Sequence, residues 1–140
     1  MKIGDYDLYS IETSEFCLDG GAMFGIIPKT LWKEKLAPDE LNRVGMVTRS
    51  LLLVGEGRKV LIDTGNGSKW AKKYINMYNI NFSKYNILIS LKKNGFTPDD
   101  ITDVICTHLH FDHVGGNTFY ANDVIEPTFP NATYWISKDN

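Results

Sequence analysis

Residues 104–113 read VICTHLHFDH, and this stretch holds all three histidines of the 140-residue chain. The apolar run 104–106 predicts a short buried strand that delivers the chain directly into the histidine cluster. Gly115 and Gly116 follow, and glycines let the backbone fold tightly and approach other groups without a Cβ clash. The stretch therefore predicts a cluster of functional side chains at the end of a buried strand.

The side chains of this cluster are of the types that bind metal ions. His108 and His110 are two residues apart, so on a strand end they point to the same side, and Asp112 and His113 are adjacent in the sharp bend that follows. A single histidine near a strand end is usually solvated or hydrogen bonded, but three histidines and an aspartate so close together are hard to explain in that way. We predict all four as metal ligands, with Zn²⁺ favoured and Mn²⁺, Fe or Co²⁺ as alternatives.

Asp63 ends the apolar run 60–62 and precedes Thr64-Gly65. Its carboxylate could accept a hydrogen bond from the far nitrogen of a ligand histidine and so fix the tautomer and orientation of that ring. Alternatively, Asp63 could simply cap a turn, which is an ordinary role for an aspartate before Thr-Gly. The residues alone leave both interpretations open.

Composition predicts one soluble domain. The chain is 43% hydrophobic and 23% charged, with a formal net charge of −2, and it has no basic stripe for a nucleic-acid backbone. Acidic residues interrupt the N-terminal stretch where a signal peptide would be apolar, and the longest apolar run, 51–54, is far too short to cross a bilayer. We therefore expect a cytoplasmic protein that binds neither nucleic acid nor membrane.

The pattern of apolar residues predicts a mixed fold. The runs 46–55 and 58–63, separated by Glu56-Gly57, are typical of a β-hairpin. Residues 68–78 and 84–94 show helical spacing, and Gly95 is placed to end the second helix with Phe96 contacting back toward Leu91. Thr97-Pro98 then predicts a new helix start.

The motif T-H-x-H-x-D-H at 107–113, together with LIDTG at 61–65, resembles the metallo-β-lactamase superfamily. The order of hairpin, Asp-Thr-Gly, helices, short strand, histidine motif and Gly-Gly-Asn is similar over residues 45–117. The stretches GGAMFGIIPKTLW and NRVGMVTRSLLL resemble the branch that includes quorum-quenching lactonases and methyl-parathion-hydrolase-like enzymes.

The resemblance implies an α/β fold, specifically half of an αββα sandwich with a mixed sheet and helices on one face. It implies that His108 and His110 bind a first metal, that Asp112 and His113 bind a second, and that Asp63 lies behind these ligands. The chemistry implied is hydrolysis by a metal-bound hydroxide. One metal would polarise the substrate, and Asp112 would pass a proton to the leaving group.

The sequence departs from the superfamily after the motif. The superfamily takes a third histidine, a bridging aspartate and a further histidine from its C-terminal half, whereas this sequence ends at Asn140 with no histidine after His113. We therefore expect residues 1–140 to form a single N-terminal half-domain whose sheet leaves one apolar face uncovered. A second copy in a homodimer, or a complementary C-terminal half, is expected to cover that face.

Two classes of function follow. The first is a metal-dependent hydrolase of small esters or lactones whose site is completed by the other half. The second is a metal-binding half-domain with little or no catalysis. Within the enzymes, a thioesterase of the glyoxalase II type is a further alternative because it shares the histidine motif.

Overall fold

A computed structural model describes residues 1–139 of the chain. The strands are β1 (Lys2–Ile3), β2 (Tyr6–Asp19), β3 (Arg43–Gly55), β4 (Arg58–Ile62), β5 (Asp103–Cys106), β6 (Thr118–Ala121), β7 (Val124–Pro127) and β8 (Thr133–Ile136). The α-helices are α1 (Gly20–Phe24), α2 (Lys29–Trp32), α3 (Lys72–Tyr78), α4 (Ile87–Lys93) and α5 (Phe111–Val114), and single 3₁₀ turns lie at η1 (Pro98–Asp100) and η2 (Gly115–Asn117).

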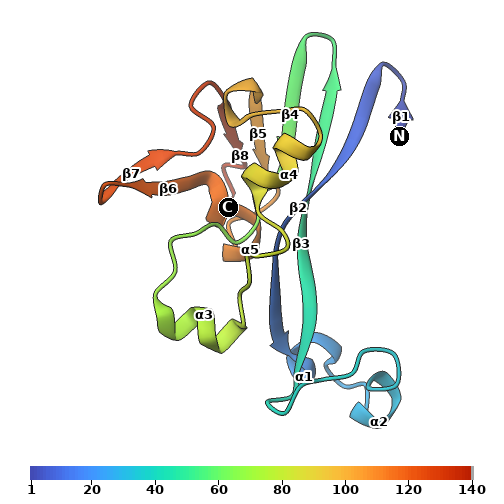
Figure 1. The fold of residues 1–140 in the computed structure, drawn as a ribbon. Coiled ribbons are helices and arrows are strands. Elements are labelled where there is room, and N and C mark those ends of the chain that lie inside the picture. The colour runs from blue at the N-terminus through green and yellow to red at the C-terminus, as the bar shows by residue number, and fades with distance from the viewer. Residues whose placement is uncertain (140) are drawn as a thin grey trace.

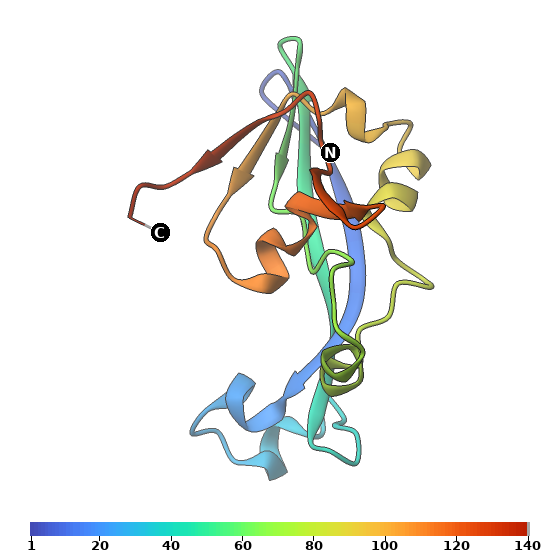
Figure 2. The same ribbon diagram turned by 90° about the vertical axis from the view of Figure 1, so that its left-hand side faces the viewer.

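Six strands form one mixed sheet in the order β1-β2-β3-β4-β5-β8. Strands β1 to β4 pair antiparallel, whereas β5 pairs parallel with both β4 and β8. The helix α4 and the separate β6–β7 hairpin lie on the same side of the strands (Figure 2). The mixed sheet with its helix layer on one face confirms the predicted fold class.

The long strands β2 and β3 form a ribbon that runs past the other strands and carries α1 and α2 at its far end (Figure 1). At this tip Trp32 is buried and its ring stacks on Phe24. The helix α2 is a single turn that begins after Pro28 and ends at Trp32.

The predicted hairpin and helix stop are both present. Strands β3 and β4 pair from Leu51–Ile62 to Gly55–Arg58, and the turn residues Glu56 and Gly57 both have positive φ, as a two-residue hairpin turn requires. At the end of α4, Gly95 has a φ of +86°, and the Phe96 amide donates to the Leu91 carbonyl at 3.0 Å. This is the Schellman arrangement that the sequence predicts.

Other elements differ from the expectation. The helix expected from Ser68 begins only at Lys72, because the Trp70 indole turns back to donate to the Asn66 carbonyl at 2.8 Å. The helix expected after Thr97 is a single 3₁₀ turn, although the capping box of Thr97 and Asp100 is formed. The predicted bend around Asp112 and His113 is the one-turn helix α5.

The hydrophobic core lies between the sheet and the α4 layer. Its fully buried members come from the strands, from α4 and from the connecting loops: Ile11, Leu52, Leu61, Leu91, Ile101, Val104 and Phe129. Cys106 is also buried there, as expected of a small apolar residue in a strand. Among residues 1–139, no helix has the length and apolar character needed to cross a membrane.

Candidate metal centre

The parallel pairing of β4 with β5 brings two distant segments of the sequence to one edge of the sheet. Ile62 pairs with Ile105, so the residues that follow each strand, Asp63 and Thr107, emerge side by side. The Asp63 amide donates to the Ile105 carbonyl at 2.9 Å, and Asp63 adopts the left-handed conformation with a φ of 59°. Aspartate tolerates this conformation better than most residues. The chain therefore turns sharply at Asp63.

The Asp63 carboxylate contacts both ends of the histidine motif. Its Oδ1 accepts from the Thr107 backbone N–H at 2.9 Å, and its Oδ2 lies 2.8 Å from the Thr107 hydroxyl and 2.7 Å from His113 Nδ1. A proton on His113 Nδ1 makes this a hydrogen bond and leaves Nε2 with a free lone pair. The structure thus combines both interpretations of Asp63, because it closes a turn and contacts a candidate ligand histidine. Its role behind a metal stays a prediction.

The four candidate ligands form two pairs. His108 Nε2 and His110 Nδ1 are 3.1 Å apart, and His113 Nε2 lies 3.6 Å from Asp112 Oδ2. Two ligands on one tetrahedral zinc, each about 2.0–2.1 Å from it, stand about 3.3 Å apart. Each pair therefore has the spacing of two ligands on a shared ion. The His108 and His113 rings lie together, with centroids 3.9 Å apart, so the two pairs are neighbours.

The donor set fits zinc in its chemistry, but it does not complete a zinc site. Imidazole nitrogen and carboxylate oxygen are ordinary zinc ligands, and zinc takes three or four of them. Within residues 1–139 no group of three or more His, Cys, Asp or Glu side chains is arranged to hold one ion. Each pair would need further ligands from another polypeptide segment or from water.

Two turns in backbone contact hold the end of the motif in place. The Thr64 amide donates to the His113 carbonyl at 2.7 Å, and the Gly116 amide donates to the Gly65 carbonyl at 3.0 Å. A methyl group on Gly67 would overlap the Gly115 carbonyl, and one on Gly116 would overlap the Thr64 carbonyl. These glycines are needed because no side chain fits where the turns cross.

Side chains from the α3 segment support the same region. The Trp70 ring packs edge-on against Phe111 of the motif at a centroid distance of 5.3 Å, and Tyr78 stacks on Phe111 at the same distance. Lys69 Nζ donates to the Gly115 carbonyl at 2.8 Å and to the Thr118 carbonyl, and partial burial lowers the pKa of this lysine. Its ammonium thus ties down the backbone that follows His113.

Sequence analysis identified the candidate ligands, but it did not identify Thr107 as a residue that contacts them. Thr107 was only the first letter of the motif, yet its hydroxyl lies 3.1 Å from His108 Nδ1 and also contacts Asp63. The Thr107 hydroxyl therefore links His108 to the Asp63 carboxylate. Its place directly before His108 at a strand end was the available signal.

Comparisons with known proteins all point to one family. The sequence model of the metallo-beta-lactamase superfamily matches residues 43–137 of this chain. An N-acyl homoserine lactonase from Bacillus thuringiensis is 36% identical over 84 residues, covering 53% of this chain and 33% of that protein. Metallo-beta-lactamase domain-containing protein 1 from Xenopus laevis is 44% identical over 60 residues, covering 41% of this chain and 26% of that protein. The chain therefore matches about a third or less of the length of these relatives.

Solved structures agree over nearly the whole chain. A probable metal-dependent hydrolase from Staphylococcus aureus superposes with a TM-score of 0.88 at 32% identity and covers 99% of this chain and 49% of its own. AidC, a dizinc quorum-quenching lactonase, superposes with a TM-score of 0.74 at 28% identity and covers 99% of this chain and 44% of its own. This chain spans about half the length of each.

The family match includes β4, Asp63, β5 and the whole histidine motif, which are the segments that build the two donor pairs. Motif, fold and comparisons thus agree, and the chain belongs to the metallo-beta-lactamase superfamily.

Proposed function

We propose that this chain supplies half of the active site of a metal-dependent hydrolase acting on small esters or lactones. The proposal rests on the positions of the four candidate ligands. His108 lies beside His110 and Asp112 lies beside His113, each pair at the spacing of two ligands on one zinc ion. The lactonase names of several relatives support the substrate class. We expect the protein to act in the cytoplasm.

Bound zinc would supply a water of lowered pKa as nucleophile and would polarise the substrate carbonyl. The chain's own residues orient the site. Asp63 accepts from His113 Nδ1 and so directs Nε2 of that ring toward Asp112. Thr107 holds the Asp63 carboxylate from the other side. These contacts fix which nitrogen of His113 is free to bind an ion.

Asp112 is the group best placed to move a proton. Its side chain is 24% exposed, so it is open to substrate, and it lies beside His113 Nε2. Hydrolysis of an ester adds water across the bond between the acyl carbon and the leaving oxygen. In our proposal the Asp112 carboxylate takes the proton of the attacking water and gives it to that leaving oxygen, so that acid and alcohol are released.

We further propose that residues 1–140 act as one N-terminal half-domain and that another polypeptide segment completes the ligand set. Two donors per ion are too few, and the second face of the sheet is uncovered by the described residues. A second copy of this chain, or a complementary C-terminal half, would supply both the cover and the missing ligands.

Zinc binding to the purified chain tests the site directly. We expect equilibrium dialysis to show up to two zinc ions per chain, and His110→Ala to abolish binding at the first pair. Asp63→Asn should weaken binding by about 10–100-fold, because the asparagine amide cannot replace the carboxylate that orients His113. Leu109→Ala is the matched control, since Leu109 lies between the two histidines and is 47% exposed. Equal zinc binding by the chain and by His110→Ala would overturn the site.

Turnover separates the two candidate functions. Hydrolysis of a homoserine lactone or an aryl ester by the zinc-loaded chain, lost in Asp112→Asn and kept in Leu109→Ala, would support the hydrolase. The second candidate is a metal-binding half-domain, and it is favoured by the lack of three converging ligands in the described residues. One zinc or fewer per chain with no turnover would support that candidate instead.

A further inference from the structure

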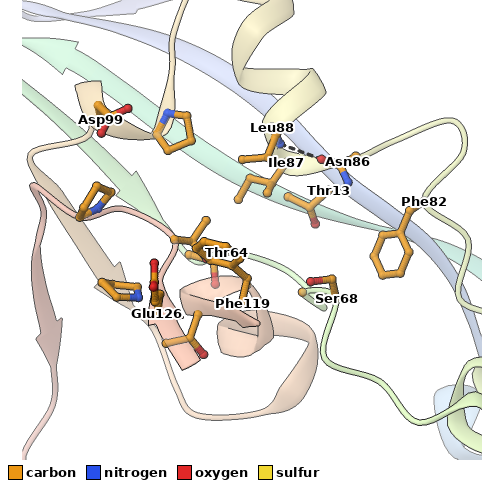
Figure 3. A pocket seen from close by; sticks show the side chains of 17 residues that line it. Thr13, Thr64, Ser68, Phe82, Asn86, Ile87, Leu88, Asp99, Phe119 and Glu126 are labelled. Atoms are coloured by element: carbon orange, nitrogen blue, oxygen red, sulfur yellow. Dashed lines mark hydrogen bonds between the residues drawn. The ribbon is translucent and has the colours of Figure 1, made fainter. Parts of the chain in front are cut away.

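A pocket of about 420 Å³ lies between α4 and the β6–β7 hairpin, beside the glycine turns that hold the end of the histidine motif. One wall is the start of α4 with Ile87 and Leu88, and the facing wall is the hairpin with Phe119. Figure 3 shows these side chains directed toward the space between the two elements. None of the candidate metal ligands lines this pocket. Its size is typical of a site for a small molecule.

The floor of the pocket offers few free polar groups. The Thr64 hydroxyl already bonds to Asn117 Oδ1 at 2.9 Å, and the Thr13 hydroxyl is 2.5 Å from that of Thr48. The Asn86 side chain accepts from the Leu88 amide at 2.9 Å as the cap of α4. Ser68, Thr118 and Thr128 add hydroxyl groups to the lining, and the rest of the interior presents methyl groups, prolines and aromatic rings to a ligand.

The charges that line the pocket are all negative. The lining residues include Asp99 and Glu126 and no lysine, arginine or histidine. Within residues 1–139 neither carboxylate takes part in a hydrogen bond or an ion pair. Figure 3 shows both at the end of the pocket opposite Phe82. Across the hairpin Glu126 pairs with Phe119, so a carboxylate and an aromatic ring lie next to each other.

Carboxylates and aromatic faces both attract cations, and apolar walls attract hydrocarbon. We propose that this pocket binds a small primary amine in its ammonium form, with its aromatic or aliphatic body between Leu88 and Phe119. The ammonium would lie at the end with Glu126 and Asp99. Because the pocket lies on the helix-covered side of the sheet, a partner on the opposite face would leave it open. The proposal is independent of metal binding.

The probe for this site is 2-phenylethylamine, which is protonated at neutral pH. We expect titration of the ¹⁵N-labelled chain to shift the amide signals of Thr64, Leu88, Gly116 and Phe119. The uncharged 2-phenylethanol should bind at least fivefold more weakly, and the anionic 3-phenylpropanoate should not shift these signals. Added salt should weaken amine binding, because the carboxylates are exposed.

Matched variants test the role of the charges. The double substitution Asp99→Asn and Glu126→Gln should weaken binding of 2-phenylethylamine about fivefold or more without changing the fold, because both side chains are exposed. Asp123→Asn removes a charge from the turn of the same hairpin, outside the pocket, and should leave the affinity unchanged. Equal binding of the three probes, equal binding by the double variant, no shifts at all, or shifts centred on Ile62 and Ile105 would each overturn the proposal.

Discussion

Two neighbouring rows of side chains cross the same strands and have opposite environments. One row runs through Tyr9, Leu52, Leu61, Val104 and Tyr134, and its three central members are fully buried. The next row, one residue along each strand, runs through Leu51, Ile62, Ile105 and Trp135. In that row Ile105 is 39% exposed and Trp135 is 52% exposed.

The difference between the rows lies in what covers them, because both are apolar. The first row packs under Leu91 of α4, Ile101 and Phe129. Within residues 1–139 no comparable layer covers the second row. Exposed apolar surface of this kind marks an interaction site or an aggregation hazard. The uncovered face and the incomplete ligand pairs support our proposal that a partner segment completes the structure, and the partner itself stays a prediction.

The largest expected effect tests the covered row. Leu61→Ala should lower the free energy of unfolding by about 2–5 kcal/mol, because it leaves a cavity in the fully buried core. Ile105→Ala, one residue along in register, should cost less than half as much in the isolated chain, since Ile105 is already partly exposed. Urea unfolding followed by circular dichroism measures both. Similar losses for the two variants would show that the second row is buried in solution.

Charge on the uncovered row tests for a partner. Ile105→Lys should weaken self-association or binding of a complementary half by at least about tenfold, because a buried lysine is strongly disfavoured. Size-exclusion chromatography with light scattering, at several protein concentrations, measures the change. Lys92→Ala, on the exposed side of α4, serves as the control. A stable and well-folded monomer at micromolar concentration, with or without the substitution, would argue against both proposed partners.

The smallest expected effect concerns Asp103, a buried charge on the uncovered side of the sheet. Arg58 holds its pKa at about 2, well below the usual 3.8, and the Trp135 indole donates to Asp103 Oδ1 at 2.8 Å. Because the folded pKa is depressed, this stabilisation is present above about pH 4 and is lost as the pH falls toward 2. Asp103→Asn should cost about 1 kcal/mol at pH 7, since Arg58 is half exposed, and should flatten the acid limb of a stability curve. An unchanged acid limb would contradict the assignment.

Local signals in the sequence predicted much of the fold. The turn at Glu56-Gly57 and the helix stop at Gly95 are determined by backbone conformations that few residues adopt, so they could be identified from neighbouring residues alone. The β6–β7 hairpin was not predicted, because its strands are short and mostly exposed. Its Asn122-Asp123 turn, with positive φ at both residues, was the signal available.

The candidate site was predictable where its residues are contiguous. His108 to His113 could be identified as one group because their spacing is encoded in a single stretch. The contact of Asp63 with His113 depends on the left-handed turn at Asp63 and on the parallel pairing of β4 with β5, which no local pattern specifies. The pocket beside α4 could not be predicted from the sequence either, because the residues that form its walls are far apart in the chain. The roles of all five residues in metal binding stay predictions.

The crossing of the two glycine turns has a consequence for how the histidine loop could respond to a cation. The segment between Thr107 and Gly115 is anchored at one end by the Asp63 carboxylate and at the other by backbone contacts with residues 64–67. Between these anchors Leu109 and His110 are exposed, and the half-buried residues that follow form only the short helix α5. The imidazole of His110 is therefore free to change rotamer when an ion arrives, while the anchored ends of the loop stay in place.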